Sequence, residues 1–431
     1  MSAFRIIYKT GSRIRNPSIS KKLSFLLETQ AWDIDQLINF QIKRLNDLLA
    51  FSNRYSNFYR KRFKKNGIDL KIKHLEDLKH VPPITKNELI LHNDDIHSKY
   101  KFNKTFISET SGTTGQVLTF NKNEEWDSEN RAAMLRCYNW HNVKPWEYNI
   151  YMWGYNIDKK RRKKIRLMDF LQNRYRIFDY NTDSLRLLLD KISNASFIHG
   201  YSSMIYELSK IFNSENIETY PKKLKMIKGT SEKIFSYYNE EVEKAFGVKM
   251  ISEYGAAESG LIAFECKYGN MHINMENVIV EEVNKEIIVT NLASFSFPII
   301  RYKLGDYIKL LPTDKYCKCG LEHPIIKEVS GRVGKNIYGL NKIYPSFTFY
   351  YIFKNLYFER GLKLSYQCIQ YEKGHLLVLI KEKYSEGLEK LIKKEFEKYF
   401  GEDIKMRIKF SQDFHTYKNK LIDFISQVDD S

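Results

Sequence analysis

A short run of glycines and hydroxyl residues is the strongest local signal for chemistry in this sequence: Thr110-Ser111-Gly112-Thr113-Thr114-Gly115. Glycines let the backbone approach an anion closely, and the surrounding amides and hydroxyls can donate hydrogen bonds to it. Because no Lys-Ser/Thr pair follows the second glycine, the run is not a Walker A loop. Two interpretations remain, a phosphate-binding loop and a flexible surface turn.

Charged residues further along the chain could complete a nucleotide site. Glu258 closes a segment that begins at Tyr254, where a carboxylate could hold Mg²⁺ beside phosphates or could lie in a solvated loop. Asp306 could accept hydrogen bonds from two ribose hydroxyls, and Arg332 could clamp a phosphate or carboxylate with two parallel bonds. Each motif alone is unspecific, since Gly-Asp turns are common.

The five cysteines do not indicate a disulfide framework, because their number is odd and nothing marks secretion. Cys317 and Cys319 are two residues apart, and Cys266 and His272 lie upstream. Two close thiolates with a distant cysteine and a histidine fit tetrahedral zinc ligation. The alternative is a set of reduced thiols without a metal.

Helices and strands must position these residues. Apolar spacing predicts helices over residues 20–80, and short β-rich runs alternate with helices from about 100 to 310, which favours α/β architecture. Strands are expected on both sides of the glycine run, and a helix is expected over 231–246 with Ser231 as its cap. After about residue 330, a hairpin, a helix over 385–400 and a further strand predict a small α+β domain.

The order and spacing of these motifs resemble the adenylate-forming superfamily, and more closely its phenylacetate–CoA ligase and CapK-like branch. The resemblance covers nearly the whole chain. The matching segments are residues 55–60, 75–78, 83–86, 110–115, 229–233, 254–258, 297–306, 331–332 and 416–420.

This resemblance implies an α/β fold with a large multi-layer N-terminal adenylation domain, residues 1–332, and a small α+β C-terminal lid domain, residues 335–431. The large domain would hold the ATP and acyl sites. ATP and Mg²⁺ would convert a carboxylic acid to an acyl-AMP, and CoA or an amine would then accept the acyl group.

The resemblance also assigns roles residue by residue. The residues implied for ATP are Thr110, Ser111, Gly112, Thr113, Thr114 and Gly115 at the phosphates, Gly229, Thr230, Ser231, Tyr254 and Gly255 around adenine, and Asp306 at the ribose. The catalytic residues implied are Glu258 as the Mg²⁺ ligand, Arg332, and Lys420, which reaches the carboxylate and the α-phosphate. The residues implied near the acyl substrate are His199, Gly200, Tyr201 and Ala256, and relatives hold zinc with a set like Cys266, His272, Cys317 and Cys319.

The sequence departs from the family pattern at three places. Gln116 follows the phosphate loop, where many relatives soon have a lysine, and Gly334 lies in the hinge segment. Asn419 replaces the glycine of the last motif, so Lys418 is an alternative to Lys420 as the catalytic lysine. His199 has the alternative of a buried core histidine.

Composition limits the classes of function. The chain has 431 residues and a formal charge of +18, and its densest basic run, 159–164, is expected on a surface loop. That run is either solvated or a patch for a phosphorylated substrate, a nucleic acid or an anionic membrane. The aromatic residues form no RNA-recognition signature, so we expect no nucleic acid. The basic residues 1–16 lack the apolar core of a signal peptide and no apolar run spans a bilayer, so we expect a cytoplasmic monomer or homodimer with peripheral membrane association as a candidate.

Three functions follow for testing. The first is acid activation as acyl-AMP and transfer to CoA or an amine, in the biosynthesis of surface (capsular or O-antigen) polysaccharide. The second is a catabolic aryl-CoA ligase. The third, from another class, is a non-catalytic basic protein that binds nucleic acid or a membrane, which would explain the charge but not the ordered motifs.

Overall fold

The computed structural model describes residues 2–110, 118–152, 159–177, 182–215, 221–312, 316–332, 336–346, 348–362, 364–411, 413–417, 420–421 and 424–428. The chain divides into two compact units. The large unit comprises Met1–Ile234, Asn239–Leu304 and Ile308–Glu328, and the small unit comprises Phe235–Tyr238, Gly305–Tyr307 and Val329–Ser431. The predicted domain boundary and the roles of the two domains stay predictions.

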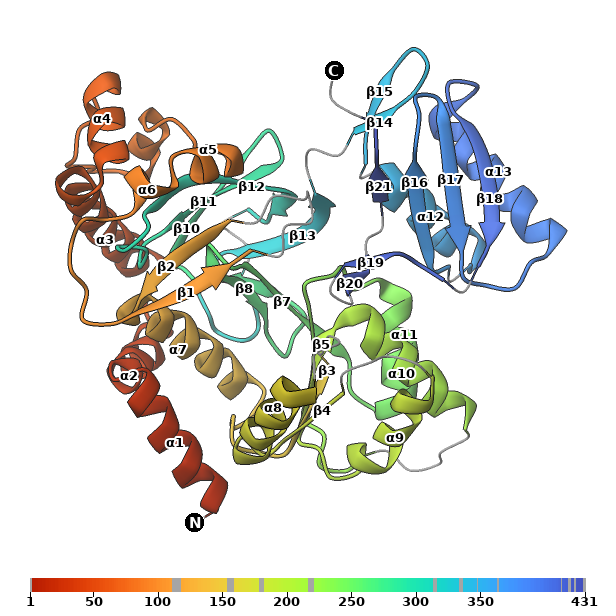
Figure 1. Ribbon diagram of the computed structural model, residues 1–431, viewed down its shortest axis with the longest axis horizontal. Coiled ribbons are helices and arrows are strands. Elements are labelled where there is room, and N and C mark those ends of the chain that lie inside the picture. The colour runs from red at the N-terminus through yellow and green to blue at the C-terminus, as the bar shows by residue number, and fades with distance from the viewer. Residues whose placement is uncertain are drawn as a thin grey trace. The chain divides into compact units, whose positions relative to one another are not determined.

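Helices fill the first hundred residues of the large unit, as predicted for residues 20–80 (Figure 1). They are α1 (Ala3–Arg15), α2 (Ile19–Thr29), α3 (Ile34–Tyr55), α4 (Asn57–Asn66), the 3-10 helix η1 (Leu75–His80), α5 (Lys86–Leu91) and α6 (Asn93–Ile96). A capping box starts α3: the Asp33 side chain accepts the Gln36 amide at 2.8 Å, and the Asp33 amide donates to Gln36 Oε1 at 3.1 Å. Leu45 and Leu48 of this helix are fully buried in the same apolar core as Ile279.

An eleven-stranded sheet forms the centre of the large unit, in the order β10-β11-β12-β13-β9-β8-β7-β6-β5-β3-β4 among the described residues. The strands are β3 (Asn149–Met152), β4 (Arg174–Arg176), β5 (Phe197–Tyr201), β6 (Met226–Thr230), β7 (Met250–Ala256), β8 (Gly260–Glu265), β9 (Met271–Ile273), β10 (Val278–Val283), β11 (Glu286–Asn291), β12 (Ile299–Leu310) and β13 (Ile325–Arg332). Strands β4, β3, β5, β6 and β7 pair in parallel, and β8 joins β7 antiparallel. Ligands of open α/β sheets bind at the carboxyl ends of such parallel strands.

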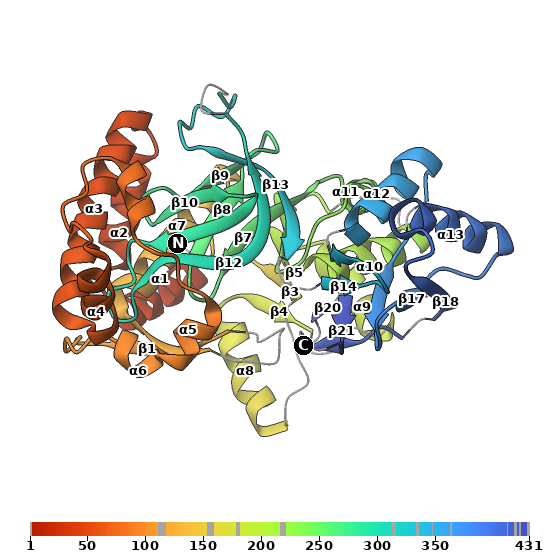
Figure 2. The same cartoon turned by 90° about the horizontal axis from the view of Figure 1, so that it is seen from above.

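A hairpin and five helices complete the large unit. They are β1 (Thr105–Glu109), β2 (Thr119–Asn123), α7 (Glu124–Trp140), α8 (Lys159–Leu171), α9 (Thr182–Ile192), α10 (Ser202–Ser214) and α11 (Ser236–Phe246), whose first three residues cluster with the small unit. The hairpin confirms the two strands predicted around the glycine run. Ala132 and Ala133 of α7 are buried with Met226 of β6 and Phe264 of β8, so α7 packs on the sheet where its parallel and antiparallel parts meet (Figure 2).

The small unit contains a four-stranded sheet in the order β18-β17-β16-β21 within its described residues. Its elements are β14 (Asn336–Tyr338), β15 (Ile343–Pro345), α12 (Thr348–Arg360), β16 (Tyr366–Gln370), β17 (His375–Ile380), α13 (Glu386–Phe400), β18 (Lys405–Phe410), β19 (Thr416–Tyr417), β20 (Lys420–Leu421) and β21 (Phe424–Ser426). The predicted hairpin, helix and strand are confirmed as β16–β17, α13 and β18, and Ser385 caps α13 by accepting the Leu388 amide at 3.1 Å.

Two predictions of local structure are wrong. The helix expected over 231–246 begins at Ser236, because Ser231 has a left-handed backbone with φ of +66° and does not cap it. The basic run at 159–164 is the start of helix α8 rather than a loop, which fits the good helix propensity of lysine and arginine. Among the described residues, no helix is long and apolar enough to cross a membrane.

Candidate active site and a cysteine–histidine cluster

Residues predicted to flank adenine lie on two neighbouring parallel strands, at their carboxyl ends. Thr230 of β6 is paired with Glu253 of β7, and the Thr230 hydroxyl donates to Glu253 Oε1 at 3.2 Å. Position 229 has no room for a side chain, because a Cβ there would lie 2.5 Å from Ser202 Oγ and 2.8 Å from Met250 Sδ. The structure therefore brings Gly229, Thr230 and the Glu253 end of β7 together.

The predicted adenine and acyl residues of β7 lie where this strand turns into β8. Tyr254 and Ala256 are half-buried and Gly255 is exposed, with a register shift between Tyr254 and Gly255. Ala256 pairs with Gly260 across the turn. Ser231 is exposed and directly follows β6, the parallel neighbour of β7.

Glu258, the predicted Mg²⁺ ligand, is buried with 5% exposure, so the alternative of a solvated loop is wrong. The Tyr302 hydroxyl donates to Glu258 Oε1 at 2.8 Å, and the Asn291 side chain donates to the Glu258 carbonyl at 3.2 Å. Tyr302 belongs to the matching segment 297–306, so that motif holds the carboxylate in place. Mg²⁺ binds through one or two carboxylates together with water and substrate phosphates, so Glu258 offers a ligand of the right type.

Lys122 of β2 is a candidate residue that the sequence did not single out. Its ammonium lies 5.3 Å from the Trp126 ring centroid and 5.7 Å from that of Phe120. Burial lowers the pKa of Lys122, while the carboxylates of Asp127 and Glu258 oppose that shift. Lys122 lies two residues after the buried Phe120 and so shares its face of β2, which is the signal that could have found it.

Thr110 ends the described part of the glycine run, and residues 111–117 lie outside it, including Ser111, Gly112, Thr113, Thr114 and Gly115. Thr110 is buried, its amide donates to the Leu118 carbonyl at 2.9 Å, and its hydroxyl accepts the Leu118 amide at 3.1 Å. These two bonds close the hairpin at the base of the loop.

The remaining predicted nucleotide and catalytic residues lie on other strands. Asp306 is half-buried in β12, Arg332 ends β13, and Lys420 begins β20, where it pairs with Tyr417. The side chains of Arg332 and Lys420 lie outside the described part of the structure, as do Lys418, Asn419 and Gly334. Their predicted roles therefore stay predictions.

His199 and its neighbours, predicted near the acyl substrate, lie on β5 beside β6, with Gly200 paired to Gly229 and Tyr201 to Thr230. Position 200 also has no room for a side chain, because a Cβ there would lie 2.2 Å from the Met152 carbonyl oxygen. His199 is buried, and its Nε2 lies 3.2 Å from Asn149 Oδ1. Burial, followed by the charges of Lys228, Arg174 and Arg176, holds the pKa of His199 well below its usual value.

These cations form a row that the sequence analysis did not foresee. The strand registers align Arg176, Tyr151, His199 and Lys228 across β4, β3, β5 and β6. The guanidinium carbons of Arg174 and Arg176 lie 4.3 and 4.4 Å from the Tyr151 ring centroid. The Arg-x-Arg alternation of β4 was the available signal, but the partner strands cannot be known from sequence.

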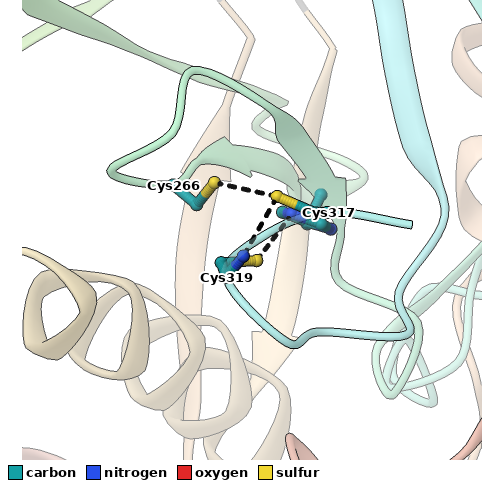
Figure 3. A group of neighbouring side chains, drawn as sticks. Cys266, Cys317 and Cys319 are labelled. Atoms are coloured by element: carbon teal, nitrogen blue, oxygen red, sulfur yellow. Dashed lines mark hydrogen bonds between the residues drawn. The ribbon is translucent and has the colours of Figure 1, made fainter. Parts of the chain in front are cut away.

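Cys266, His272, Cys317 and Cys319 come together as one cluster, whose candidate ligand atoms all lie within 4.8 Å of one another. Figure 3 shows the three thiols turned toward one another, with 3.7 Å between the sulfurs of Cys266 and Cys317. His272 Nε2 lies 3.2 Å from Cys319 Sγ. Sulfurs bound to one tetrahedral zinc lie about 3.8 Å apart, given Zn–S bonds of about 2.3 Å. The donor set and its spacing therefore fit zinc.

Outer contacts orient this cluster. His272 Nδ1 lies 2.8 Å from the His323 carbonyl oxygen, which fixes the tautomer that leaves Nε2 toward the sulfurs. The Asn270 side chain donates to Cys317 Sγ at 3.1 Å. Burial raises the pKa of the Cys319 thiol to about 12, whereas hydrogen bonds, led by that from the Cys319 amide, outweigh burial and lower the pKa of Cys317. A bound cation would supply the charge that thiolates need here.

Comparison with known proteins gives the class of fold. No family model matches the sequence. The chain is similar to the crystal structure of 2-hydroxyisobutyryl-CoA ligase in the postadenylation state with 2-HIB-AMP, with a TM-score of 0.71, 15% identity, and coverage of 92% of this chain and 90% of that chain. The open conformation of that ligase with 2-HIB-AMP and CoA gives a TM-score of 0.59 at 15% identity, covering 90% and 91%. The chain has the fold of the adenylate-forming ligases, which confirms the predicted fold class.

A sequence relative narrows the comparison. Protein CapK of Staphylococcus aureus is 24% identical to this chain over 290 residues, which are 64% of this chain and 64% of CapK. The resemblance drawn from the motifs, adenylate-forming and CapK-like, is confirmed. The match therefore spans slightly less than two thirds of the length of each protein.

Proposed function

We propose that this protein is an adenylate-forming ligase, which joins a carboxylic acid to the AMP part of ATP and releases pyrophosphate. The observation that carries the proposal is that the buried Glu258 accepts a hydrogen bond from Tyr302 and interacts electrostatically with Lys122. Lys122 is on β2, the strand that follows the glycine run in sequence, so the proposed Mg²⁺ ligand lies near the hairpin that carries the proposed phosphate loop. The fold shared with a ligase over 92% of this chain supports the same conclusion.

Each group has a defined chemical task in this proposal. The loop 110–115 holds the phosphates, Glu258 holds Mg²⁺, the ends of β6 and β7 flank adenine, and Asp306 accepts the ribose hydroxyls. Mg²⁺ neutralises charge on the phosphates when bound. Lys420 then places positive charge on the attacking carboxylate and the α-phosphate, with Arg332 nearby, which lowers the barrier to a mixed anhydride. The 335–431 domain acts as the lid that carries Lys420.

The acyl acceptor is the open part of the function. The ligase to which this chain is similar was crystallised with CoA, which supports CoA as the second substrate. The motif resemblance to the CapK-like branch implies a place in surface polysaccharide biosynthesis, where an amine acceptor would give an amide. We propose a cytoplasmic enzyme that acts on a small carboxylate, with CoA or an amine as its partner.

The test is pyrophosphate release with ATP and Mg²⁺ across aryl, fatty, amino and uronic acids, with hydroxylamine as a surrogate acceptor. We expect one acid class to respond, and replacement of hydroxylamine by CoA then separates a CoA ligase from an amide synthase. Lys420→Ala should reduce adenylation about 10²- to 10³-fold while ATP binding persists. Normal turnover of this variant would show that Lys420 is the wrong lysine, and Lys418→Ala is the matched control.

A second variant tests the metal ligand. Glu258→Gln keeps the size of the side chain but removes its charge, so it should raise the Mg²⁺ concentration needed for half-maximal rate. Glu76→Gln, on an exposed site of η1, is the control and should leave that requirement unchanged. An unaltered metal requirement in Glu258→Gln would remove this residue from the site.

We also propose that Cys266, His272, Cys317 and Cys319 hold one structural zinc. Elemental analysis of the purified chain should give about one zinc per chain, and Cys319→Ser should lose it and melt at a lower temperature. Cys368→Ser replaces a buried cysteine elsewhere and should keep the zinc. A chain that never binds metal and keeps its melting temperature after chelation would refute the site.

A further inference from the structure

Helix α1 is amphipathic in an unusual sense, because its most apolar face is turned away from the protein. Ile6, Ile7 and Ile14 are 55%, 39% and 72% exposed. At about 100° per residue these three side chains share one face of the helix. Isoleucine on a helix surface is normally turned toward the core, so this face is suited to a partner.

The other face of α1 packs on the large unit. Phe4, Tyr8 and Ser12 are half-buried, and the Tyr8 ring lies 6.1 Å from the Trp146 ring. Burial raises the pKa of Tyr8. The aromatic side of α1 is fixed against the protein. The isoleucines on the opposite side therefore point to solvent.

Helix α8 is a neighbour of α1 and also exposes large apolar side chains. The Phe4 and Phe170 rings make an edge contact at 6.2 Å, so α1 and α8 lie side by side (Figure 1). Leu167, Met168 and Phe170 of α8 are 60%, 47% and 67% exposed. Two adjacent helices thus present large apolar side chains to solvent, and we call the outward faces of α1 and α8 the α1–α8 surface.

Both helices are rich in basic residues. The sequence of α1 contains Arg5, Lys9, Arg13 and Arg15 and no acidic residue. The sequence of α8, KKRRKKIRLMDFL, contains seven basic residues and one acid. That acid, Asp169, is buried and bonded to Arg176 at 2.8 and 2.9 Å, so it does not offset the exposed cations.

We propose that the α1–α8 surface binds an anionic lipid membrane. Interfacial helices combine basic residues, which meet the lipid headgroups, with exposed apolar residues, which enter the boundary with the acyl chains. A nucleic acid would satisfy the cations alone and leave Ile6, Ile14 and Phe170 in water. The occurrence of both features on two adjacent helices therefore favours lipid. This inference is independent of the ligase activity.

Sedimentation of the full chain with vesicles tests the proposal. The chain should bind phosphatidylcholine vesicles doped with phosphatidylglycerol and should bind pure phosphatidylcholine much less. Lys163→Glu/Lys164→Glu should weaken binding about 25-fold or more, since each lysine near an anionic surface contributes about fivefold. Lys71→Glu/Lys73→Glu changes two exposed lysines elsewhere in the large unit and is the charge-matched control.

The apolar part is tested separately. Ile6→Ser/Ile14→Ser should weaken binding about tenfold or more without lowering the melting temperature, because both side chains are exposed. Leu91→Ser/Leu187→Ser, at sites 77% and 64% exposed, is the matched control and should bind as the parent does. No binding to anionic vesicles at low salt would overturn the proposal. The proposal would also be overturned, in favour of a nucleic acid, if Ile6→Ser/Ile14→Ser bound the vesicles as tightly as the parent and the parent bound duplex DNA as tightly as the vesicles.

Discussion

Two buried charged networks of the large unit differ in how their charges balance. Beside the cysteine–histidine cluster, Arg136 and Glu276 have fully buried side chains, and Arg136 donates to Glu276 Oε2 at 3.1 Å and to Asn274 at 2.6 Å. Burial opposes ionisation of Glu276, yet Arg136 and His323 hold the pKa of that carboxyl well below its usual range. Arg136 and Glu276 therefore each have the other as a buried counter-charge.

The second network lies across β4, β3, β5, β6 and β7, and it contains more cations than carboxylates. Arg174 and Arg176 share Asp169, at 3.7 and 2.8 Å, while Lys228 pairs with Glu253. Three cations therefore meet two carboxylates, and His199 stays neutral among them.

The difference separates a network that maintains the fold from one suited to a ligand. A balanced, dehydrated ion pair is costly to break but offers nothing to a bound molecule. A buried surplus of cations beside His199, Gly200 and Tyr201 suits a negatively charged ligand.

The largest predicted effect is on the balanced network. Glu276→Gln should lower the free energy of unfolding by about 3–5 kcal/mol, because it leaves Arg136 buried without a counter-charge. Urea unfolding followed by tryptophan fluorescence measures this change. Arg186→Met, at an exposed pair with Glu215, is the control and should cost at most about 1 kcal/mol. A loss as small as that in Glu276→Gln would mean that the network does not support the fold.

Much of the scaffold could be predicted from sequence, because it depends on local signals. Caps and apolar spacing located the helices of residues 20–80, and turn residues located the hairpin at residues 366–381. The order of motifs gave the fold class. The start of α11 was missed, because Ser231 adopts a left-handed backbone that a serine rarely takes and that no neighbouring residue announces.

The sequence predicted several residues of the candidate site but not the contacts that these residues make. Glu258 was predicted as a site residue. Its hydrogen bond from Tyr302 was not predicted, because the two residues are 44 positions apart in the sequence. The cluster of Cys266, His272, Cys317 and Cys319 could be proposed because zinc ligation has a recognisable donor set. Lys122 and the row from Arg176 to Lys228 were missed, since strand register decides them.

A smaller effect should appear in the pH dependence of stability, through the second network. The folded chain holds the pKa of His199 well below its usual value, whereas an unfolded histidine titrates near about 6.5. As pH falls below about 6.5, the unfolded state takes up a proton that the folded state refuses. The folded state should therefore lose up to about 1.4 kcal/mol per pH unit, and no such loss should occur above that pH.

The comparison of wild type with His199→Gln isolates this contribution. Burial also lowers the pKa of His97 and His141, so wild type alone would mix several groups. Thermal melts from pH 7 to about pH 5 should show a shallower decline in the variant than in wild type. Parallel declines would mean that His199 is already protonated in the folded chain, against the surplus of cations around it.

The smallest effect on stability should come from Arg174→Met. Arg174 shares Asp169 with Arg176, and burial lowers the pKa of its guanidinium, so its charge is only partly compensated. Removal of this charge should change the free energy of unfolding by less than about 1 kcal/mol, because Arg176 still neutralises Asp169. If the surplus serves an anionic substrate, the same variant should raise the KM for the carboxylate about tenfold while the KM for ATP stays constant. A stability loss as large as that of Glu276→Gln would show that Arg174 belongs to the fold, and the contrast between the two networks would fail at that residue.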